Sequence, residues 1–274
     1  MRISPDMDFL ATEWDHICQT RGIVTRFRPT PYADLHLGNI WCALQNKVIA
    51  VRMGGEFVLM LDDDTYNLQR CYTSPIALPL DVCKEHYVED LTWLGLAPDR
   101  VYFSSEARSE LEQAAHRLGI REPKGFYDEG NLGVMWRRVA QIGTEYCQYT
   151  PWVALAAVVD DHVNGVGAFV RGMDLCGEAL LYDYLNLQLG WVPAQQGYCS
   201  LVRRGWGYTK ETKSTGAPSV RALREAGVGP DGILDTLREL DWRRQQESRD
   251  SINIPAGILE VPKVPETIAW HGYT

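Results

Sequence analysis

The stretch TRFRPTPYADLHLGN, residues Thr25–Asn39, carries the signals that decide the fold. The β-rich run Ile23–Phe27 predicts a short strand, and the two prolines that follow it force an extended loop. From His36 to Arg52 the apolar residues recur at helical spacing, and the glycines at 54 and 55 then end the predicted helix. A strand, a loop and a helix in this order form the first part of a βαβ unit.

The rest of the chain alternates predicted strands and helices, which is typical of an α/β fold with a parallel sheet. Residues 119–150 interrupt the alternation as an irregular insertion, and residues 252–274 are expected to follow the surface without regular structure. The further predicted strands are Phe57–Leu61, Val101–Phe103, Val153–Val159 and Ser200–Val202. The further predicted helices are residues 1–20, Leu80–Leu94, Ser105–Leu118, Asp174–Leu189, Ser219–Arg224 and Gly232–Arg244.

The composition is that of a globular protein, with 45% hydrophobic and 23% charged residues, which excludes disordered and fibrous classes. The net charge of −9 argues against broad electrostatic binding of nucleic acid but leaves a local basic patch open. The longest apolar run, Trp152–Val159, is far shorter than a membrane span. The acidic N-terminus predicts no signal peptide and seven scattered cysteines predict no disulfide framework, so we expect a cytoplasmic protein without a membrane partner.

Two segments carry residues suited to phosphate chemistry. At the predicted helix start, unpaired backbone N–H groups attract phosphate, Gly38 allows close approach of a nucleotide, and His36 can donate hydrogen bonds. The alternative is that His36 only starts or packs the helix. In the loop KETKSTG at residues 210–216, Lys210 and Lys213 can clamp a triphosphate. The alternative here is a solvated surface loop.

Two acidic runs invite interpretation as metal sites. Asp160, Asp161 and His162 are adjacent, but consecutive residues rarely face one ion together, and the cysteine spacing completes no zinc site. The run at residues 62–64 has three aspartates, for which capping a helix or forming a turn is the alternative. The sequence therefore predicts neither a resident metal nor zinc.

Taken in order, these segments resemble the catalytic domain of glutamyl-tRNA synthetases, class I aminoacyl-tRNA synthetases with a Rossmann-type parallel sheet. LHLGN at 35–39 is similar to the HIGH motif of that family, and KETKS at 210–214 is similar to its KMSKS motif. The resemblance covers roughly residues 21–240 and implies a nucleotide-binding catalytic domain over 1–240 and a tail over 241–274. Further similar blocks are GGEFVL at 54–59, LDD at 61–63, LTWLGL at 91–96, YFSSE at 102–106, VVDDH at 158–162, VRG at 170–172 and LGW at 189–191.

The resemblance implies adenylate chemistry, in which a substrate carboxylate attacks the α-phosphate of ATP and pyrophosphate leaves, with Mg²⁺ accompanying the ATP. It also implies that Arg26 and Arg171 bind the side-chain carboxylate of glutamate while Asp62 receives its amino group, and bidentate arginine pairing suits an acidic substrate. The implied residues are His36, Asn39, Lys210, Thr212 and Lys213 for catalysis, His36, Gly38, Lys210 and Lys213 for ATP, and Arg26, Arg28, Thr30, Asp62, Val153, Ala157 and Arg171 for the amino acid.

The chain departs from the family pattern within the amino-acid site. The RIEDTD segment of the family reads MLDDDT at residues 60–65, so its arginine is lost. Val153 and Ala157 stand where the family has a tyrosine and an asparagine, and Arg28 replaces a small residue. A site that loses hydrogen-bonding partners changes its substrate preference. We therefore expect glutamate or a related acidic amino acid.

Two differences in length bear on the acceptor of the activated acyl group. Only 53 residues separate Glu106 from Asp160, where the family has a longer insertion that grips tRNA, and a short tail follows Arg244 in place of an anticodon-binding domain. With the net negative charge, these differences favour a ligase that transfers the acyl group to a small amine or a carrier protein. Two alternatives remain open: a minimal tRNA-charging or tRNA-modifying synthetase, and an inactive synthetase-like sensor.

Overall fold

In the computed structural model, the structure describes residues 22–63, 77–119, 151–199, 219–237 and 258–260. The helix predicted at residues 1–20, the insertion and the lysine-containing loop at 210–216 lie outside the described residues. Within the described part, no helix is long and apolar enough to cross a membrane.

The centre of the molecule is a sheet with strand order β3-β2-β1-β4-β5-β6. Strands β1 to β5 are parallel, and β6 pairs with β5 in the antiparallel sense. This order confirms the predicted Rossmann-type parallel sheet. The strands are β1 Val24–Phe27, β2 Glu56–Leu61, β3 Arg100–Phe103, β4 Val166–Gly172, β5 Gln195–Cys199 and β6 Ile258–Glu260.

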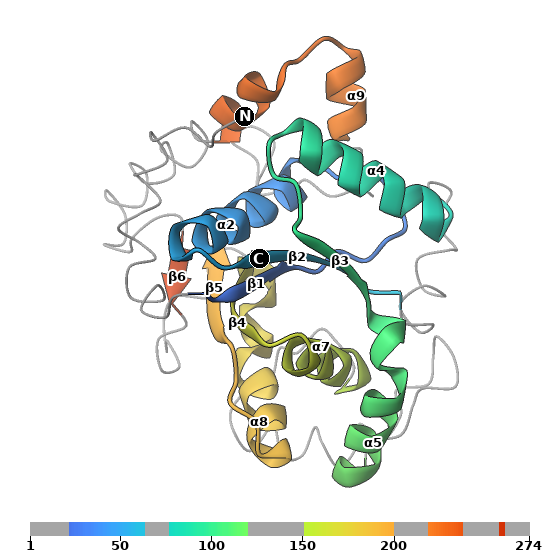
Figure 1. Ribbon diagram of the computed structural model, residues 1–274, viewed down its shortest axis with the longest axis vertical. Coiled ribbons are helices and arrows are strands. Elements are labelled where there is room, and N and C mark those ends of the chain that lie inside the picture. The colour runs from blue at the N-terminus through green and yellow to red at the C-terminus, as the bar shows by residue number, and fades with distance from the viewer. Residues whose placement is uncertain (1–21, 64–76, 120–150, 200–218, 238–257, 261–274) are drawn as a thin grey trace, which may run out of the picture.

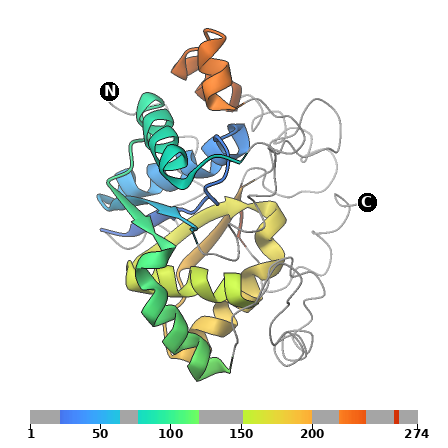
Figure 2. The same cartoon turned by 90° about the vertical axis from the view of Figure 1, so that its right-hand side faces the viewer.

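Helices cover both faces of the sheet, with α2 and α4 on one face and α5, α7 and α8 on the other (Figures 1 and 2). The short helix α9 lies beyond α4 on the first side (Figure 1). Two 3₁₀ turns, η2 Ser104–Ala107 and η3 Met173–Glu178, lead into α5 and α8. The labelled helices are α2 Leu37–Met53, α4 Leu80–Trp93, α5 Arg108–Leu118, α7 Pro151–Val163, α8 Ala179–Leu189 and α9 Val220–Glu225, and residues 230–237 are also helical.

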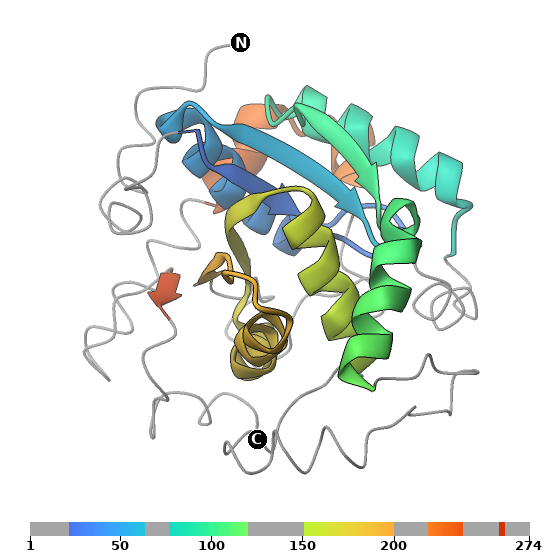
Figure 3. The same ribbon diagram turned by 60° about the horizontal axis from the view of Figure 1, so that its bottom comes forward.

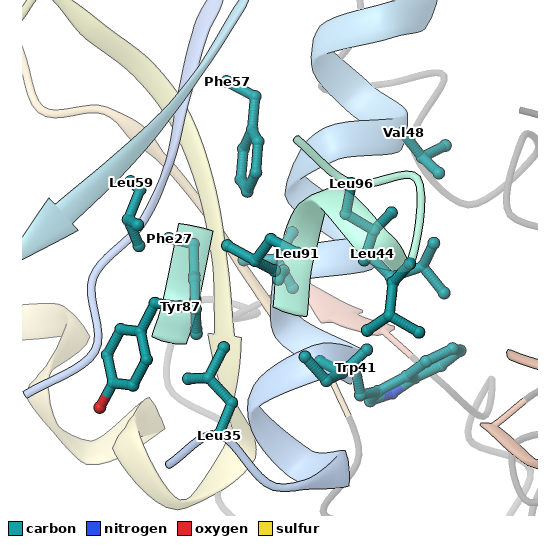
Figure 4. Packing of buried hydrophobic residues seen from close by; sticks show 14 of the residues in the cluster. Phe27, Leu35, Trp41, Leu44, Val48, Phe57, Leu59, Tyr87, Leu91 and Leu96 are labelled. Atoms are coloured by element: carbon teal, nitrogen blue, oxygen red, sulfur yellow. The ribbon is translucent and has the colours of Figure 1, made fainter. Parts of the chain in front are cut away.

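Strand β2 shows how the two hydrophobic cores are divided. Phe57, Leu59 and Leu61 face the core beneath α2 and α4, whereas Val58 and Met60 face the core beneath α5, α7 and α8. Because successive side chains of a strand point to opposite faces, a strand buried on both sides reads as a continuous apolar run. Figure 4 shows the first core, where Phe57 and Leu59 meet side chains of α2 and α4.

One predicted strand is wrong. Val153–Val159 belongs to helix α7, and the strand that occupies the centre of the sheet is β4, which follows it. Most of the described side chains of α7 are buried, because this helix lies between the sheet and the helices α5 and α8 (Figure 3). A helix that is apolar on most sides shows no 3.6-residue period, so its sequence reads like a buried strand.

Two other expectations need correction near the end of the chain. Strand β5 lies at Gln195–Cys199, where no strand was predicted, and the strand expected at Ser200–Val202 lies outside the described residues. The region 252–274, expected to be irregular, contributes the three-residue strand β6 to the edge of the sheet.

Asn46 links strands β1 and β4 by hydrogen bonds. From β1 the chain adds strands toward one edge of the sheet, and from β4 it adds them toward the other edge. β1 and β4 are neighbours, but the helices that follow them, α2 and α8, lie on opposite faces (Figure 1). The Asn46 Nδ2 donates to the Val170 carbonyl at 2.8 Å and its Oδ1 accepts from the Val170 N–H at 2.9 Å, while Thr25 Oγ1 donates to the Asn46 carbonyl at 2.9 Å. Ligands of open α/β sheets bind at the carboxyl ends of the strands beside such a reversal.

Replacing Asn46 by Leu removes both side-chain bonds to Val170 and leaves a buried N–H and a buried carbonyl without partners. We expect a loss of about 2 to 4 kcal/mol in the free energy of unfolding, measured with urea. Asn186 is equally buried but donates only to the Tyr182 carbonyl one turn back in its own helix, so Asn186→Leu serves as the control. Equal losses for the two variants would contradict the bridging role.

Helix α9 is attached to α4 by ion pairs. Arg221 and Arg224 both bind the exposed Glu89, and Arg224 does so at 2.9 Å. Beneath them, Asp90 is fully buried, and its carboxylate lies 3.7 Å from the Arg221 Nε without a hydrogen bond among the described residues. Burial raises the pKa of Asp90 to about 6. The ionised form of Asp90 therefore works against folding.

The raised pKa makes stability depend on pH. Between about pH 4 and 6 the folded chain holds a proton on Asp90 that the unfolded chain releases, so this group lowers stability as pH rises. We expect Asp90→Asn to gain stability relative to the parent as pH increases from 4 to 7, measured by urea unfolding.

Glu89 serves as the matched control for Asp90, because its pKa is shifted in the opposite direction. The two arginines lower the pKa of Glu89, so its contribution is present at neutral pH and is lost as pH falls. Glu89→Gln should therefore cost more stability at pH 7 than at pH 4. Parallel pH profiles for the two variants would show that burial does not perturb Asp90.

Candidate active site

The start of helix α2 is capped by the side chains of His36 and Asn39. His36 is the residue before the helix, and its Nδ1 accepts from the Gly38 N–H at 3.0 Å. The Asn39 Oδ1 accepts from the His36 N–H at 3.2 Å, which completes a capping box. Because Nδ1 is an acceptor, the proton of the neutral ring lies on Nε2, which is a hydrogen-bond donor. The helix-starting role of His36 is thus observed.

Gly38 is required by the packing of the His36 ring. A Cβ atom at this position would lie 2.9 Å from His36 Cε1 and 3.1 Å from Nδ1. Backbone N–H groups in the first turn of α2 are also hydrogen-bonded within the turn, because those of Asn39 and Ile40 both donate to the His36 carbonyl. Backbone N–H groups that are already bonded are poor partners for phosphate. The phosphate role predicted for this turn therefore depends on side chains.

The end of the lysine-containing segment meets the helix start directly. His36 and Ser219 form an antiparallel bridge, and the Val220 N–H donates to the Leu35 carbonyl at 2.8 Å. Ser219 follows residues 200–218 immediately. The predicted residues Lys210, Thr212 and Lys213 lie in that segment, outside the described residues.

Arg26, at the carboxyl end of β1, is bound to a buried carboxylate. Its Nε and Nη2 donate to the two oxygens of Asp161 at 2.7 and 3.0 Å, and the Tyr182 hydroxyl donates to the same carboxylate at 2.8 Å. The Arg26 guanidinium also lies 3.8 Å from the centre of the Phe169 ring. The fork of Arg26 predicted to hold a substrate carboxylate is thus taken by Asp161.

Arg28 binds two more carboxylates at the same edge. Its Nη1 and Nη2 donate to Asp62 at 2.9 and 3.0 Å, and its Nε donates to Asp160 at 3.1 Å. Asp160 also accepts from Ser104 at 2.7 Å and from Tyr102 at 3.3 Å. Burial raises the pKa of Asp160 to about 6, although Arg28 and Ser104 oppose the shift. Arg28 therefore holds together the ends of β1 and β2 and helix α7.

Arg171, near the end of β4, has hydrogen-bonding capacity to spare. Its Nη2 donates to Gln196 at 3.0 Å and to the Tyr198 hydroxyl at 2.9 Å. Among the described residues its buried Nε has no hydrogen-bond partner, and neither has the nearby Glu178 Oε1. Glu178 lies 3.6 Å from Nη1, and burial raises its pKa to about 7. An arginine with an unused donor in such a setting fits a carboxylate ligand.

The remaining predicted residues lie nearby. Val153 and Ala157 are one helical turn apart on α7, and Asp161 is one turn further, so all three lie on one face of the helix. Helix α7 therefore places Val153 and Ala157 on the same face as Asp161, the partner of Arg26. Thr30 lies in the loop after β1, where its carbonyl accepts from the Tyr87 hydroxyl at 3.3 Å.

The run Asp160-Asp161-His162 faces three different surroundings. Asp160 binds Arg28, Asp161 binds Arg26, and the His162 ring stacks on Trp191 with centroids 3.8 Å apart. Across the described residues no group of three His, Cys, Asp or Glu side chains is arranged to hold a metal ion.

Sequence reasoning missed the residues that hold Arg171. Gln196 and Tyr198 lie on β5, where no strand was predicted, and no motif singles them out. Ser104 lies in the YFSSE block and Tyr182 on α8, and their partners are 56 and 21 positions away, so local patterns do not connect them.

Comparison with known proteins agrees with this architecture. Residues 22–135 match the family model described as tRNA synthetases class I (E and Q), catalytic domain. These residues belong to that family. A glutamate–tRNA ligase 2 of Ruegeria sp. strain TM1040 is 38% identical, covering 79% of this chain and 60% of that protein. A glutamate–tRNA ligase 2 of Neorickettsia sennetsu is 26% identical, covering 90% of this chain and 62% of that protein.

The synthetase domain also has the fold of a solved relative. The glutamate–tRNA synthetase of Elizabethkingia anophelis superimposes with a TM-score of 0.59 at 17% identity, covering 81% of this chain and 62% of that one. The chain spans about three fifths of the length of the relatives it matches.

The contact between Gly38 and His36 gives a direct test of the helix start. In Gly38→Ala the new methyl group displaces the His36 ring, so we expect the KM for ATP to rise about tenfold while stability changes by about 1 kcal/mol or less. Gly232→Ala is the control, since a Cβ there meets only Val228 at 3.5 Å. An unchanged KM in pyrophosphate exchange would remove His36 from the nucleotide site.

Proposed function

We propose that the synthetase domain activates glutamate or a related acidic amino acid as its aminoacyl-adenylate. The observation that carries the proposal is Arg171, a largely buried guanidinium whose buried Nε has no partner among the described residues. In the reaction an oxygen of the substrate α-carboxylate attacks the α-phosphorus of ATP, and the bond to the pyrophosphate group breaks. Family membership supports ATP-dependent aminoacylation in general.

In this proposal Arg171 binds the side-chain carboxylate of the substrate. Gln196 and Tyr198 orient the guanidinium by accepting from Nη2, which leaves the Nε side for the ligand. A protonated Glu178 reduces the repulsion that a second carboxylate would meet, and its raised pKa supports that form near neutral pH.

Arg28 gives the site a particular way to bind the substrate ammonium. Asp62 has both oxygens engaged by Arg28, and because each carboxylate oxygen can accept more than one hydrogen bond, an ammonium group binds either beside the guanidinium or in its place. Asp160 already accepts from Arg28 Nε at 3.1 Å, so Arg28 can stay paired with Asp160 while it releases Asp62.

The lysine segment supplies the charge for phosphoryl chemistry in this proposal. Lys210, Thr212 and Lys213 stabilise the transition state, and ATP enters with Mg²⁺ as the substrate. The bridge between His36 and Ser219 supports this role, because it fixes the end of the segment at the start of α2. His36 Nε2 and Asn39 complete the phosphate side of the site.

For the acceptor, the comparisons favour tRNA, because the relatives are named as glutamate–tRNA ligases. Transfer to a small amine or a carrier protein is the second candidate. The 53 residues between Glu106 and Asp160 and the net charge of −9 support this second candidate. We also propose a cytoplasmic location, as expected from the sequence.

ATP–pyrophosphate exchange tests the proposal. We expect exchange with glutamate and a fall of at least about 100-fold in Lys213→Ala, the size typical for loss of one charge-stabilising group. Lys84→Ala is the control, because Lys84 is an exposed residue on α4. Each variant is measured with glutamate, aspartate and glutamine, with and without bulk tRNA. Unchanged exchange in Lys213→Ala would overturn the assignment of the loop.

The acceptor is resolved in the same reaction mixtures. Radioactive glutamate that becomes bound to tRNA supports tRNA charging, whereas exchange without tRNA and acyl transfer to an added amine support the second candidate. Binding of glutamate without exchange under every condition would favour an inactive sensor and overturn the proposed activity.

A further inference from the structure

Two cysteines lie against each other beside the nucleotide-binding end of the sheet. The Sγ atoms of Cys42 and Cys199 are 3.3 Å apart, although 157 positions separate the residues in the chain. Cys42 lies on α2 and is half-buried, and Cys199 is the last residue of β5 and is buried. Both are free thiols.

The backbones on both sides of this contact are fixed by hydrogen bonds. The Asn46 Nδ2 donates to the Cys42 carbonyl at 2.8 Å, and Cys199 pairs with Gly172 in the parallel ladder between β4 and β5. The short distance between the two sulfur atoms therefore results from the packing of helix α2 against the sheet. A disulfide has a bond length of about 2.05 Å, so closing it requires the sulfur atoms to approach by little more than 1 Å.

We propose that Cys42 and Cys199 are an oxidisable dithiol that forms a disulfide between α2 and β5. Cys42 is the more accessible thiol, and as the thiolate it attacks a low-molecular-weight disulfide and releases one thiol. The Cys199 sulfur then attacks Cys42 Sγ in the mixed disulfide and releases the second thiol. In total the cysteine pair loses two electrons and two protons, and one small disulfide becomes two thiols.

The surroundings determine which step is slow. The hydrogen bond with Cys42, together with burial, raises the pKa of Cys199. Because the thiolate is the nucleophile, the second step is slower than the first. The second step therefore limits the rate of disulfide formation, and the disulfide is reversed when a small thiol is added.

The position of the pair links it to the proposed function. Cys42 lies three residues after Asn39 on α2, and Cys199 directly precedes residues 200–218, which include Lys210 and Lys213. The disulfide would join the helix of the phosphate site covalently to the start of the lysine segment. If the proposed adenylate chemistry holds, oxidation should slow pyrophosphate exchange several-fold.

The test is oxidation of the full chain by oxidised glutathione, followed by thiol counting and peptide mapping without reduction. We expect the linked peptides of Cys42 and Cys199, and their separation by dithiothreitol. Cys42→Ser and Cys199→Ser should each abolish the link, whereas Cys176→Ser should leave it. A stable glutathione adduct on Cys42 with a free Cys199 would overturn the inference.

Activity measurements separate this inference from the proposed function. A mapped Cys42–Cys199 bond with several-fold slower exchange, restored by dithiothreitol and absent in Cys42→Ser, supports both. Absence of exchange in the fully reduced chain counts against the proposed function, while the mapped bond still decides the inference. A mapped bond with unchanged exchange would overturn the link between the disulfide and activity.

Discussion

The pairing of two buried arginines with three buried aspartates is the constraint on which the site depends. Arg26 and Arg28 extend from β1, and they bind Asp161, Asp160 and Asp62 from helix α7 and the end of β2. Removing one partner from such a group leaves an uncompensated buried charge, which costs roughly 3 to 5 kcal/mol. The positions of α7 and of the two strand ends are therefore tied to one another through charge.

Arg26 and Arg28 differ from Arg171 in how fully their guanidinium groups are hydrogen-bonded within the chain. Arg26 and Arg28 serve mainly to build the edge of the sheet, because their forks are occupied within the chain. Arg171 donates to Gln196 and Tyr198 through Nη2 and lies 3.6 Å from Glu178 through Nη1, but its Nε has no partner among the described residues. In the proposed function, Arg171 therefore binds the anionic group of the substrate, and Asp62, which Arg28 holds, receives the substrate ammonium.

Much of the fold can be predicted from local patterns, and the failures have physical causes. Each end of strand β2 and of helix α2 was predicted to within one residue, because an apolar run and a glycine stop are local signals. Strand β4 was missed because glycines interrupt its start. A Cβ at Gly167 would lie 2.6 Å from Cγ1 of Ile23, the residue directly before β1, so a larger residue would force the Ile23 side chain to shift. The partners of Arg28 were missed because they lie up to 132 positions away.

Helix α2 begins where the sequence predicted, but the simplest physical reason to expect phosphate binding at its start does not hold. A free helix N-terminus binds phosphate through unpaired N–H groups. Here the N–H groups of Gly38, Asn39 and Ile40 are all bonded within the turn, so little of that capacity remains. What the turn offers instead is a His36 ring of fixed tautomer and a backbone bridge to Ser219. In the proposed function, phosphate binding at this end of the sheet therefore depends on the side chains of His36 and Asn39 together with Lys210 and Lys213, rather than on unpaired backbone N–H groups.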